Sequence, residues 1–105
     1  MALPFDLSED ALYDLEEAVS YLAVENPSAA LRLADELEKT FLFLAQWPST
    51  GHPREDLTEN TTIRFWPCKG YLIGYFGDRS PILIACVLHG SRDATSILTP
   101  RLDRL

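Results

Sequence analysis

The sequence predicts an α+β domain in which a pair of helices packs on one antiparallel sheet. Three observations lead to this prediction. Apolar residues recur every three or four positions through residues 8–25 and 27–46, as on the buried face of a helix. Three apolar segments separated by turn residues follow, at 61–66, 71–76 and 81–88. The length of 105 residues suits one domain, residues 1–105, with the order β-α-α-β-β-β and a short C-terminal helix.

The first element is a short strand in which Leu3, Phe5 and Leu7 alternate with polar or small neighbours. Pro4 has no backbone N–H and cannot donate to a neighbouring strand. We therefore expect this strand at an edge of the sheet.

The first helix is expected to begin after Ser8, whose hydroxyl suits a helix N-cap. Acidic side chains such as Asp14 fall mostly off the apolar stripe, which places them toward solvent. The stripe consists of Leu12, Leu15, Val19 and Leu22, widened by Ala11 and Ala18.

The second helix is expected to begin at Pro27, because Asn26 is a good cap and proline is favoured in the first helical position. It should end before Trp47. The connection is so short that the two helices must be antiparallel, and both stripes need the sheet as a common partner. The second stripe is Ala30, Leu33, Leu37, Phe41 and Leu44.

The segments at 61–66, 71–76 and 81–88 follow a loop over 48–60 and are joined by short turns, which predicts an antiparallel meander. The third contains seven apolar residues in a row, Ile82 to Leu88, as in a strand buried on both faces. That strand should deliver the polar pentapeptide 89–93 to its end.

The formal net charge is −7, and residues 8–47 alone account for a charge of −7. Strong binding to nucleic acid needs a basic face, so the composition argues against it. No apolar run is long enough to span a membrane and the N-terminus lacks signal-peptide features, so we expect a cytoplasmic protein. Two cysteines and two histidines without ligand spacing predict neither a disulfide nor a metal site, and nothing indicates a cofactor.

Five short motifs occur in one order along nearly the whole chain. They are Leu7-Ser8, Asn26-Pro27-Ser28-Ala29-Ala30, Trp47-Pro48 with Gly51 and Pro53, Tyr71-Leu72-Ile73, and Val87-Leu88-His89-Gly90-Ser91-Arg92-Asp93. Together they resemble the RelE/ParE superfamily of toxins from bacterial type II toxin–antitoxin systems, and specifically its ParE-like branch.

The resemblance implies a small toxin that a cognate antitoxin neutralises, the antitoxin being a small DNA-binding protein with a flexible C-terminal segment. ParE-like members act on DNA gyrase by binding it, which favours a toxin that is not an enzyme. RelE-like members instead cleave messenger RNA on the ribosome, and that activity is the first alternative. A second alternative is an inactive homologue that only binds an antitoxin, because Cys86 stands where relatives often carry a basic residue.

The nuclease alternative can be examined residue by residue. RelE-like nucleases usually carry an arginine after the meander tyrosine and another just past the strand end, where this chain has Leu72 and Gly90. Cleavage needs a general acid or base and cations near the reacting phosphate. The side chains left for those roles would be Arg64, Lys69, His89 and Arg92.

Two helices on a single sheet should leave the second sheet face partly uncovered, and an uncovered apolar face can bind a partner. Trp66, Phe76 and the leucines of the C-terminal segment are the expected apolar contacts, and they could mediate a homodimer instead. As structural alternatives, His89 could serve only as a hydrogen-bonded strand end, and Arg92 and Asp93 could form a local ion pair that caps the final helix. The residues that we expect to bind the target or the antitoxin are Arg64, Trp66, His89, Arg92, Leu98 and Leu102.

Overall fold

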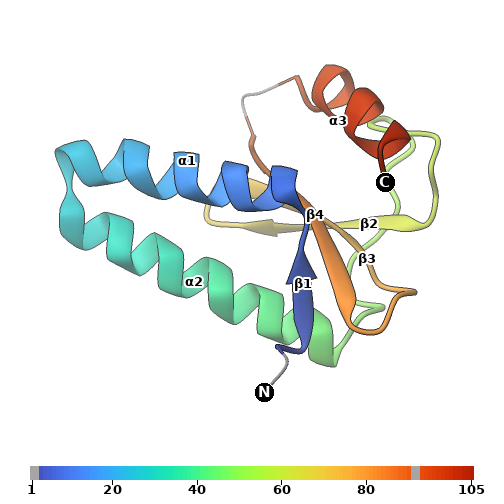
Figure 1. The fold of residues 1–105 in the computed structure, drawn as a ribbon, viewed down its shortest axis with the longest axis horizontal. Coiled ribbons are helices and arrows are strands. Elements are labelled where there is room, and N and C mark those ends of the chain that lie inside the picture. The colour runs from blue at the N-terminus through green and yellow to red at the C-terminus, as the bar shows by residue number, and fades with distance from the viewer. Residues whose placement is uncertain (1–2, 91–92) are drawn as a thin grey trace.

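The computed structural model describes residues 3–90 and 93–105, and the elements follow the predicted order (Figure 1). The helices α1 and α2 form the expected antiparallel hairpin, α1 ending at the Asn26 cap and α2 at the Trp47 cap. The elements are β1 (Phe5–Leu7), α1 (Glu9–Glu25), α2 (Pro27–Gln46), β2 (Ile63–Cys68), β3 (Tyr71–Phe76), β4 (Ile82–His89) and α3 (Ala94–Asp103).

The four strands form one sheet in the order β1-β4-β3-β2. The meander β2-β3-β4 is antiparallel as predicted, and β1 lies at an edge as the position of Pro4 suggested. The sheet is mixed, however, because β1 pairs in parallel with β4, beside which it lies in Figure 1. Phe5 lies opposite Ile82. Both helices and the strands β2 and β3 lie between β1 and β4 in the chain, although the two strands are neighbours in the sheet.

The strand β4 is buried on both faces, as its run of apolar residues predicted. Ile84 and Val87 pack toward the helical hairpin, whereas Ala85 and Cys86 pack toward the opposite face. An irregularity in the pairing of β3 with β4, between Gly74 and Tyr75, accounts for two successive residues on one face.

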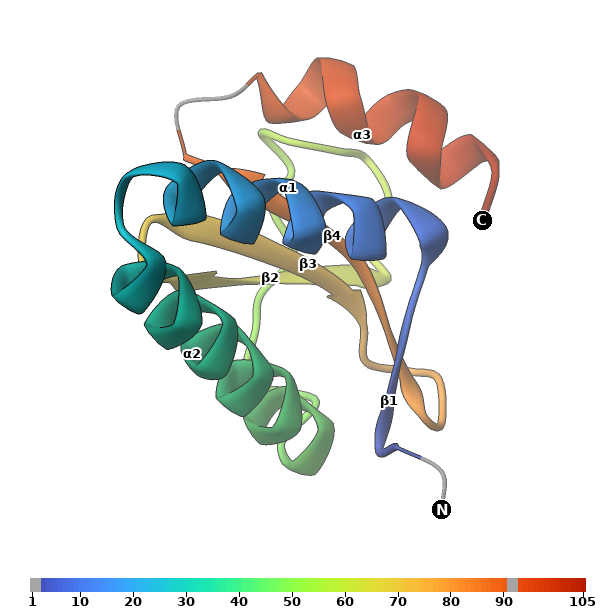
Figure 2. The same cartoon turned by 60° about the vertical axis from the view of Figure 1, so that its left-hand side comes forward.

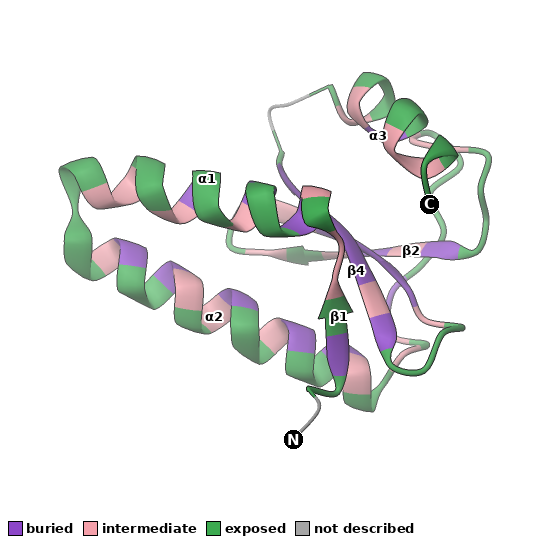
Figure 3. Ribbon diagram, viewed as in Figure 1, coloured by how far each residue is buried: buried purple, intermediate pink, exposed green. Residues whose placement is uncertain are grey.

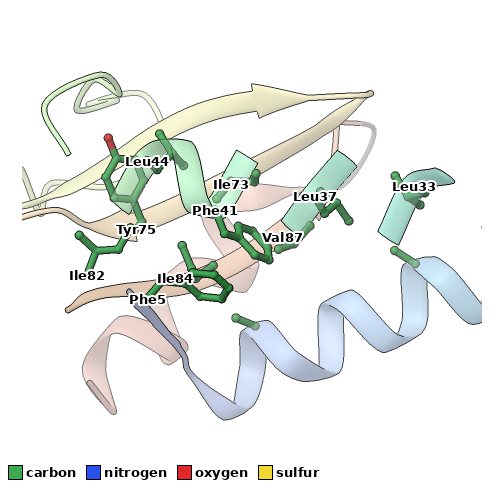
Figure 4. Packing of buried hydrophobic residues seen from close by; sticks show 12 residues of the cluster. Phe5, Leu33, Leu37, Phe41, Leu44, Ile73, Tyr75, Ile82, Ile84 and Val87 are labelled. Carbon is green, nitrogen blue, oxygen red and sulfur yellow. The ribbon is translucent and has the colours of Figure 1, made fainter. Parts of the chain in front are cut away.

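The first hydrophobic core lies between the hairpin and the sheet, and the predicted stripe of α2 is buried throughout (Figure 4). In α1 the predicted stripe is confirmed in part, with Ala11 and Ala18 buried and Leu15 and Leu22 partly buried against the core. The fully buried line of α1 runs through Ala11, Asp14 and Ala18, while Leu12 is 45% exposed. Figure 3 shows that α1 carries both buried and exposed positions. The small alanine side chains face the sheet, where α1 packs against β4. The expectation that Asp14 points to solvent is therefore wrong.

A second core occupies the other face of the sheet, where α3 packs far from α2 (Figure 2). Leu98 and Phe76 are buried there, and Leu102 and Leu57 are partly buried against them. The prediction of an uncovered second face is thus wrong, because α3 and the loop before β2 cover it.

The sequence predicts a final helix over residues 94–98 that ends before Pro100, but Pro100 lies inside α3. Proline in a helix removes one backbone donor. Here the loss falls within one turn of the end of the helix, and the residues that follow are held by other contacts. The sequence after Pro100 predicts a loose amphiphilic tail, but Arg101 and Arg104 pair with acidic side chains of α1, so that prediction is wrong. At the start of α3, Asp93 accepts a hydrogen bond from the backbone N–H of Ser96, which confirms its predicted capping role.

The loop between α2 and β2 is fixed to the sheet by Tyr75. Its buried hydroxyl donates to the carbonyl of Pro48 and accepts from the N–H of Gly51, both at 2.8 Å. A Cβ on Gly51 would lie 2.7 Å from that hydroxyl, so only glycine fits this close approach. His52 then exchanges two backbone hydrogen bonds with Phe65 and covers part of the outer edge of β2.

Candidate functional site

The ends of β3 and β4 meet at one corner of the sheet. Tyr71 lies opposite His89, and their rings contact edge to face with centroids 5.3 Å apart. Lys69 and Gly70 form the turn that leads into β3, both with positive φ, and the N–H of Gly90 donates to the carbonyl of Gly70 at 3.0 Å. The strand β4 therefore delivers an exposed imidazole to the sheet end, as predicted.

A cleft of about 510 Å³ opens beside this corner, between α1 and the ends of the strands. We call it the Tyr71 cleft. Further clefts on either side also include Tyr71, so the surface is concave on both sides of its ring. The Tyr71 cleft is lined by Asp14, Glu17, Ala18, Tyr21, Leu22, Tyr71, Val87 and His89.

Asp14 is the buried charged residue of this cleft. Its carboxylate accepts the backbone N–H of Val87 at 3.0 Å and two hydrogen bonds from Arg101 at 2.6 and 2.9 Å. Val87 lies beyond Ile84, the last residue of β4 that pairs with β1, so Asp14 satisfies a backbone donor where the edge strand has ended. Hydrogen bonding to Asp14 raises the pKa of the Arg101 guanidinium above its already high ordinary value.

The residues that the sequence predicted for partner binding, or for RNA cleavage in the nuclease alternative, do not form one cluster. His89 lies at the rim of the Tyr71 cleft, and Lys69 lines the cleft beside it. Trp66 is on β2, with its ring 6.0 Å from that of Phe43, and Arg64 donates to the carbonyl of Gly51 at 2.7 Å.

The two leucines of the C-terminal segment that were predicted to bind a partner lie under or against the second core. Leu98 is buried under α3 and Leu102 is partly buried, so neither offers the exposed surface that was expected. Arg92 lies outside the described residues.

The acidic wall of the Tyr71 cleft is the part that sequence reasoning missed. Glu17 and Tyr21 are one helical turn apart on α1, and both line the cleft with Asp14. The signal was the spacing of Ala11, Asp14 and Ala18, which places a carboxylate in the line of small residues that packs on β4. Hydrophobicity alone could not identify this line, because its middle member is charged.

The side chains at the corner can form ion pairs, hydrogen bonds and aromatic contacts. Within residues 3–90 and 93–105, no three metal-ligating side chains come together. The side chains around Tyr71 supply carboxylates, an imidazole, the Lys69 ammonium and two tyrosine rings. Helices in the described part of the chain are also not long and apolar enough to cross a membrane.

Comparisons with known proteins agree with this fold. The family model described as "ParE toxin of type II toxin-antitoxin system, parDE" matches residues 5–94. A solved structure described as "Chromosomal ParDE TA system from P. aeruginosa" has a similar fold, with a TM-score of 0.67 and 17% sequence identity, over 81% of this chain and 92% of that one. No curated protein matches the chain. Because the family model matches most of the chain, this protein belongs to the ParE toxin family of type II toxin–antitoxin systems.

Proposed function

We propose that this ParE-family protein inhibits DNA gyrase by binding it and that a cognate antitoxin neutralises it. Family membership supports a toxin, and the side chains at the sheet corner support protein binding over RNA cleavage. The observation that carries this choice is the exposed Glu17 carboxylate in the lining of the Tyr71 cleft, since the Asp14 carboxylate beside it is neutralised by Arg101.

An mRNA endonuclease must hold a polyanion and stabilise further negative charge in its transition state. The two positions where RelE-like nucleases place arginines are Leu72 and Gly90, and both line the cleft on the far side of His89. Arg54 also lines that cleft but is already paired with Asp56, at 2.7 Å. The Tyr71 cleft itself adds the Glu17 carboxylate, which repels RNA. The described residues thus favour a protein target.

A pair of assays on the purified protein tests this proposal. In the first, purified gyrase supercoils relaxed plasmid with and without the protein, and we expect supercoiling to stop and cleaved DNA to accumulate. In the second, the protein is added to a translating extract and the transcripts are sequenced. Transcript cleavage with normal supercoiling would replace the proposal with the nuclease alternative. Activity in neither assay, with normal growth on expression, would leave an inactive homologue.

Neutralisation is tested in cells. Co-expression of the small protein encoded beside this gene should restore growth and co-purify with the toxin. Growth arrest that persists in its presence would contradict neutralisation by that protein, without affecting the gyrase assay.

A further inference from the structure

The Tyr71 cleft combines two kinds of contact that suit one kind of side chain. We propose that it binds an arginine or lysine from an amphipathic segment of the antitoxin, with the charged group at Glu17 and the aliphatic stem against Tyr21 and Tyr71. The identity of the partner rests on the proposed function, whereas the chemistry of the bound side chain rests on the cleft alone.

Within the described part of the chain, the Tyr71 cleft has one carboxylate that is available to a cation from a partner, that of Glu17. Asp14 is occupied, because its oxygens already bind Arg101 and the N–H of Val87. Glu17 is exposed one turn later on the same helix and has no ion-pair partner among residues 3–90 and 93–105. A cation that enters the cleft would therefore interact with Glu17, with the paired Asp14 behind it.

An apolar surface lies beside the Glu17 carboxylate. Tyr21 is 81% exposed, which is unusual for a large aromatic ring, and Leu22 next to it also lines the cleft. Tyr71 is half-buried on the opposite wall. Arginine and lysine bury their aliphatic stems on such surfaces and keep the charge at the rim, and a guanidinium also stacks on aromatic rings.

The helices around the Tyr71 cleft are acidic. Residues 8–47, which form both helices of the hairpin, carry a formal charge of −7. An acidic or phosphate-bearing partner would be repelled from the cleft, whereas a basic segment is attracted during encounter and held in register. Charge and apolar surface thus select the same occupant, a basic amphipathic segment.

The experiment uses the full chain and a fluorescent synthetic peptide of leucine and arginine with an amphipathic helical pattern. Binding is measured by anisotropy at about 0.15 M salt, where charges more than about 8 Å apart are largely screened. The control peptide has citrulline in place of arginine, which keeps the shape of the side chain and removes its charge. We expect the arginine peptide to bind and the citrulline peptide to bind about tenfold more weakly.

Matched substitutions on α1 locate the binding. Glu17→Lys should weaken binding about tenfold, and Tyr21→Ser several-fold. Glu16→Lys makes the same change in charge on the neighbouring exposed position, and Tyr13→Ser removes a tyrosine that is 59% exposed and outside the Tyr71 cleft. Both controls should stay within about twofold of wild type, because surface charges outside the contact contribute little.

Several results would overturn the proposal. Equal loss in Glu17→Lys and Glu16→Lys would indicate general attraction to an acidic surface, and equal binding of the two peptides would exclude recognition of the cation. Unchanged binding in Tyr21→Ser would exclude the predicted stacking. The peptide assay does not depend on toxicity, so its failure is distinct from a failure to inhibit gyrase.

Discussion

Asp14 and Arg101, 87 positions apart in the chain, form a bidentate ion pair at 2.6 and 2.9 Å that joins α3 to α1. The side chain of Asp14 is 4% exposed and that of Arg101 is 13% exposed. The pair thus lies inside the protein, where a charge without its partner is costly. The pair holds α3 over the second core. It also neutralises the Asp14 carboxylate in the lining of the Tyr71 cleft.

The first prediction concerns this ion pair. Arg101→Met should lower the free energy of unfolding by about 3–5 kcal/mol, because it leaves the Asp14 carboxylate buried without a cation. Urea denaturation measures the change. Arg104→Met is the control, since Arg104 pairs with Asp10 at the surface and should cost only about 0–1 kcal/mol. Equal losses of unfolding free energy in the two variants would show that the buried pair stabilises the fold no more than the surface pair does.

The second prediction concerns the hydroxyl of Tyr75. Tyr75→Phe should cost about 1–3 kcal/mol of stability, because the N–H of Gly51 and the carbonyl of Pro48 both lose their buried partner. Hydrogen exchange at Gly51 should accelerate as the loop loosens. The same substitution at exposed Tyr13 should change stability by less than about 0.5 kcal/mol. Normal protection of Gly51 in Tyr75→Phe would contradict the proposed role of the hydroxyl.

The third prediction concerns the two thiols. Burial raises the pKa of the Cys86 thiol to about 12, so at pH 8 only about one part in ten thousand is thiolate. A thiol reagent should therefore modify only half-buried Cys68 in the native protein and both cysteines in urea. Mass spectrometry of the labelled peptides identifies the site. Cys86→Ala should leave the native labelling unchanged, and rapid native labelling of Cys86 would contradict its burial.

The fourth prediction concerns pH and the start of α3. Hydrogen bonds from the side chain and backbone N–H of Ser96 lower the pKa of the Asp93 carboxyl below its ordinary value. A depressed pKa means that this stabilisation is fully present above the unfolded pKa of about 3.9 and is lost as the pH falls through the lower folded pKa.

The amide chemical shift of Ser96, followed from about pH 5 to about pH 2, should report this loss. Asp93→Asn keeps a capping oxygen that does not titrate, so its Ser96 shift should stay flat over the same range. A flat profile in the wild-type protein would refute the role of the carboxylate.

Local sequence patterns determine much of this fold, and these parts could be predicted from the sequence. The stripe of α2 from Ala30 to Leu44 packs in the core as its spacing predicted, and the caps at Ser8 and Asn26 start the two helices. The apolar run of β4 is a doubly buried strand that ends at exposed His89. In each case the deciding interactions lie within a few residues or repeat along one element.

The features that the sequence did not predict depend on contacts between distant parts of the chain. Nothing near Asp14 shows that Arg101 will bury it, and nothing near Leu98 shows that α3 will return across the sheet despite Pro100. The same return removed the exposed second face on which the predicted binding residues depended. The Tyr71 cleft was missed for a related reason, since it forms only where α1 crosses the ends of β3 and β4.

The position of Arg101 in the chain also has a consequence for biosynthesis. Translation proceeds from the N-terminus, so both helices of the hairpin and all four strands leave the ribosome before α3 does. During that interval the Asp14 carboxylate lacks the Arg101 guanidinium, and one face of the nascent sheet lacks the cover that α3 provides. The polypeptide can therefore reach its finished shape only when α3 emerges, which gives a binding protein made at the same time an interval in which to meet it.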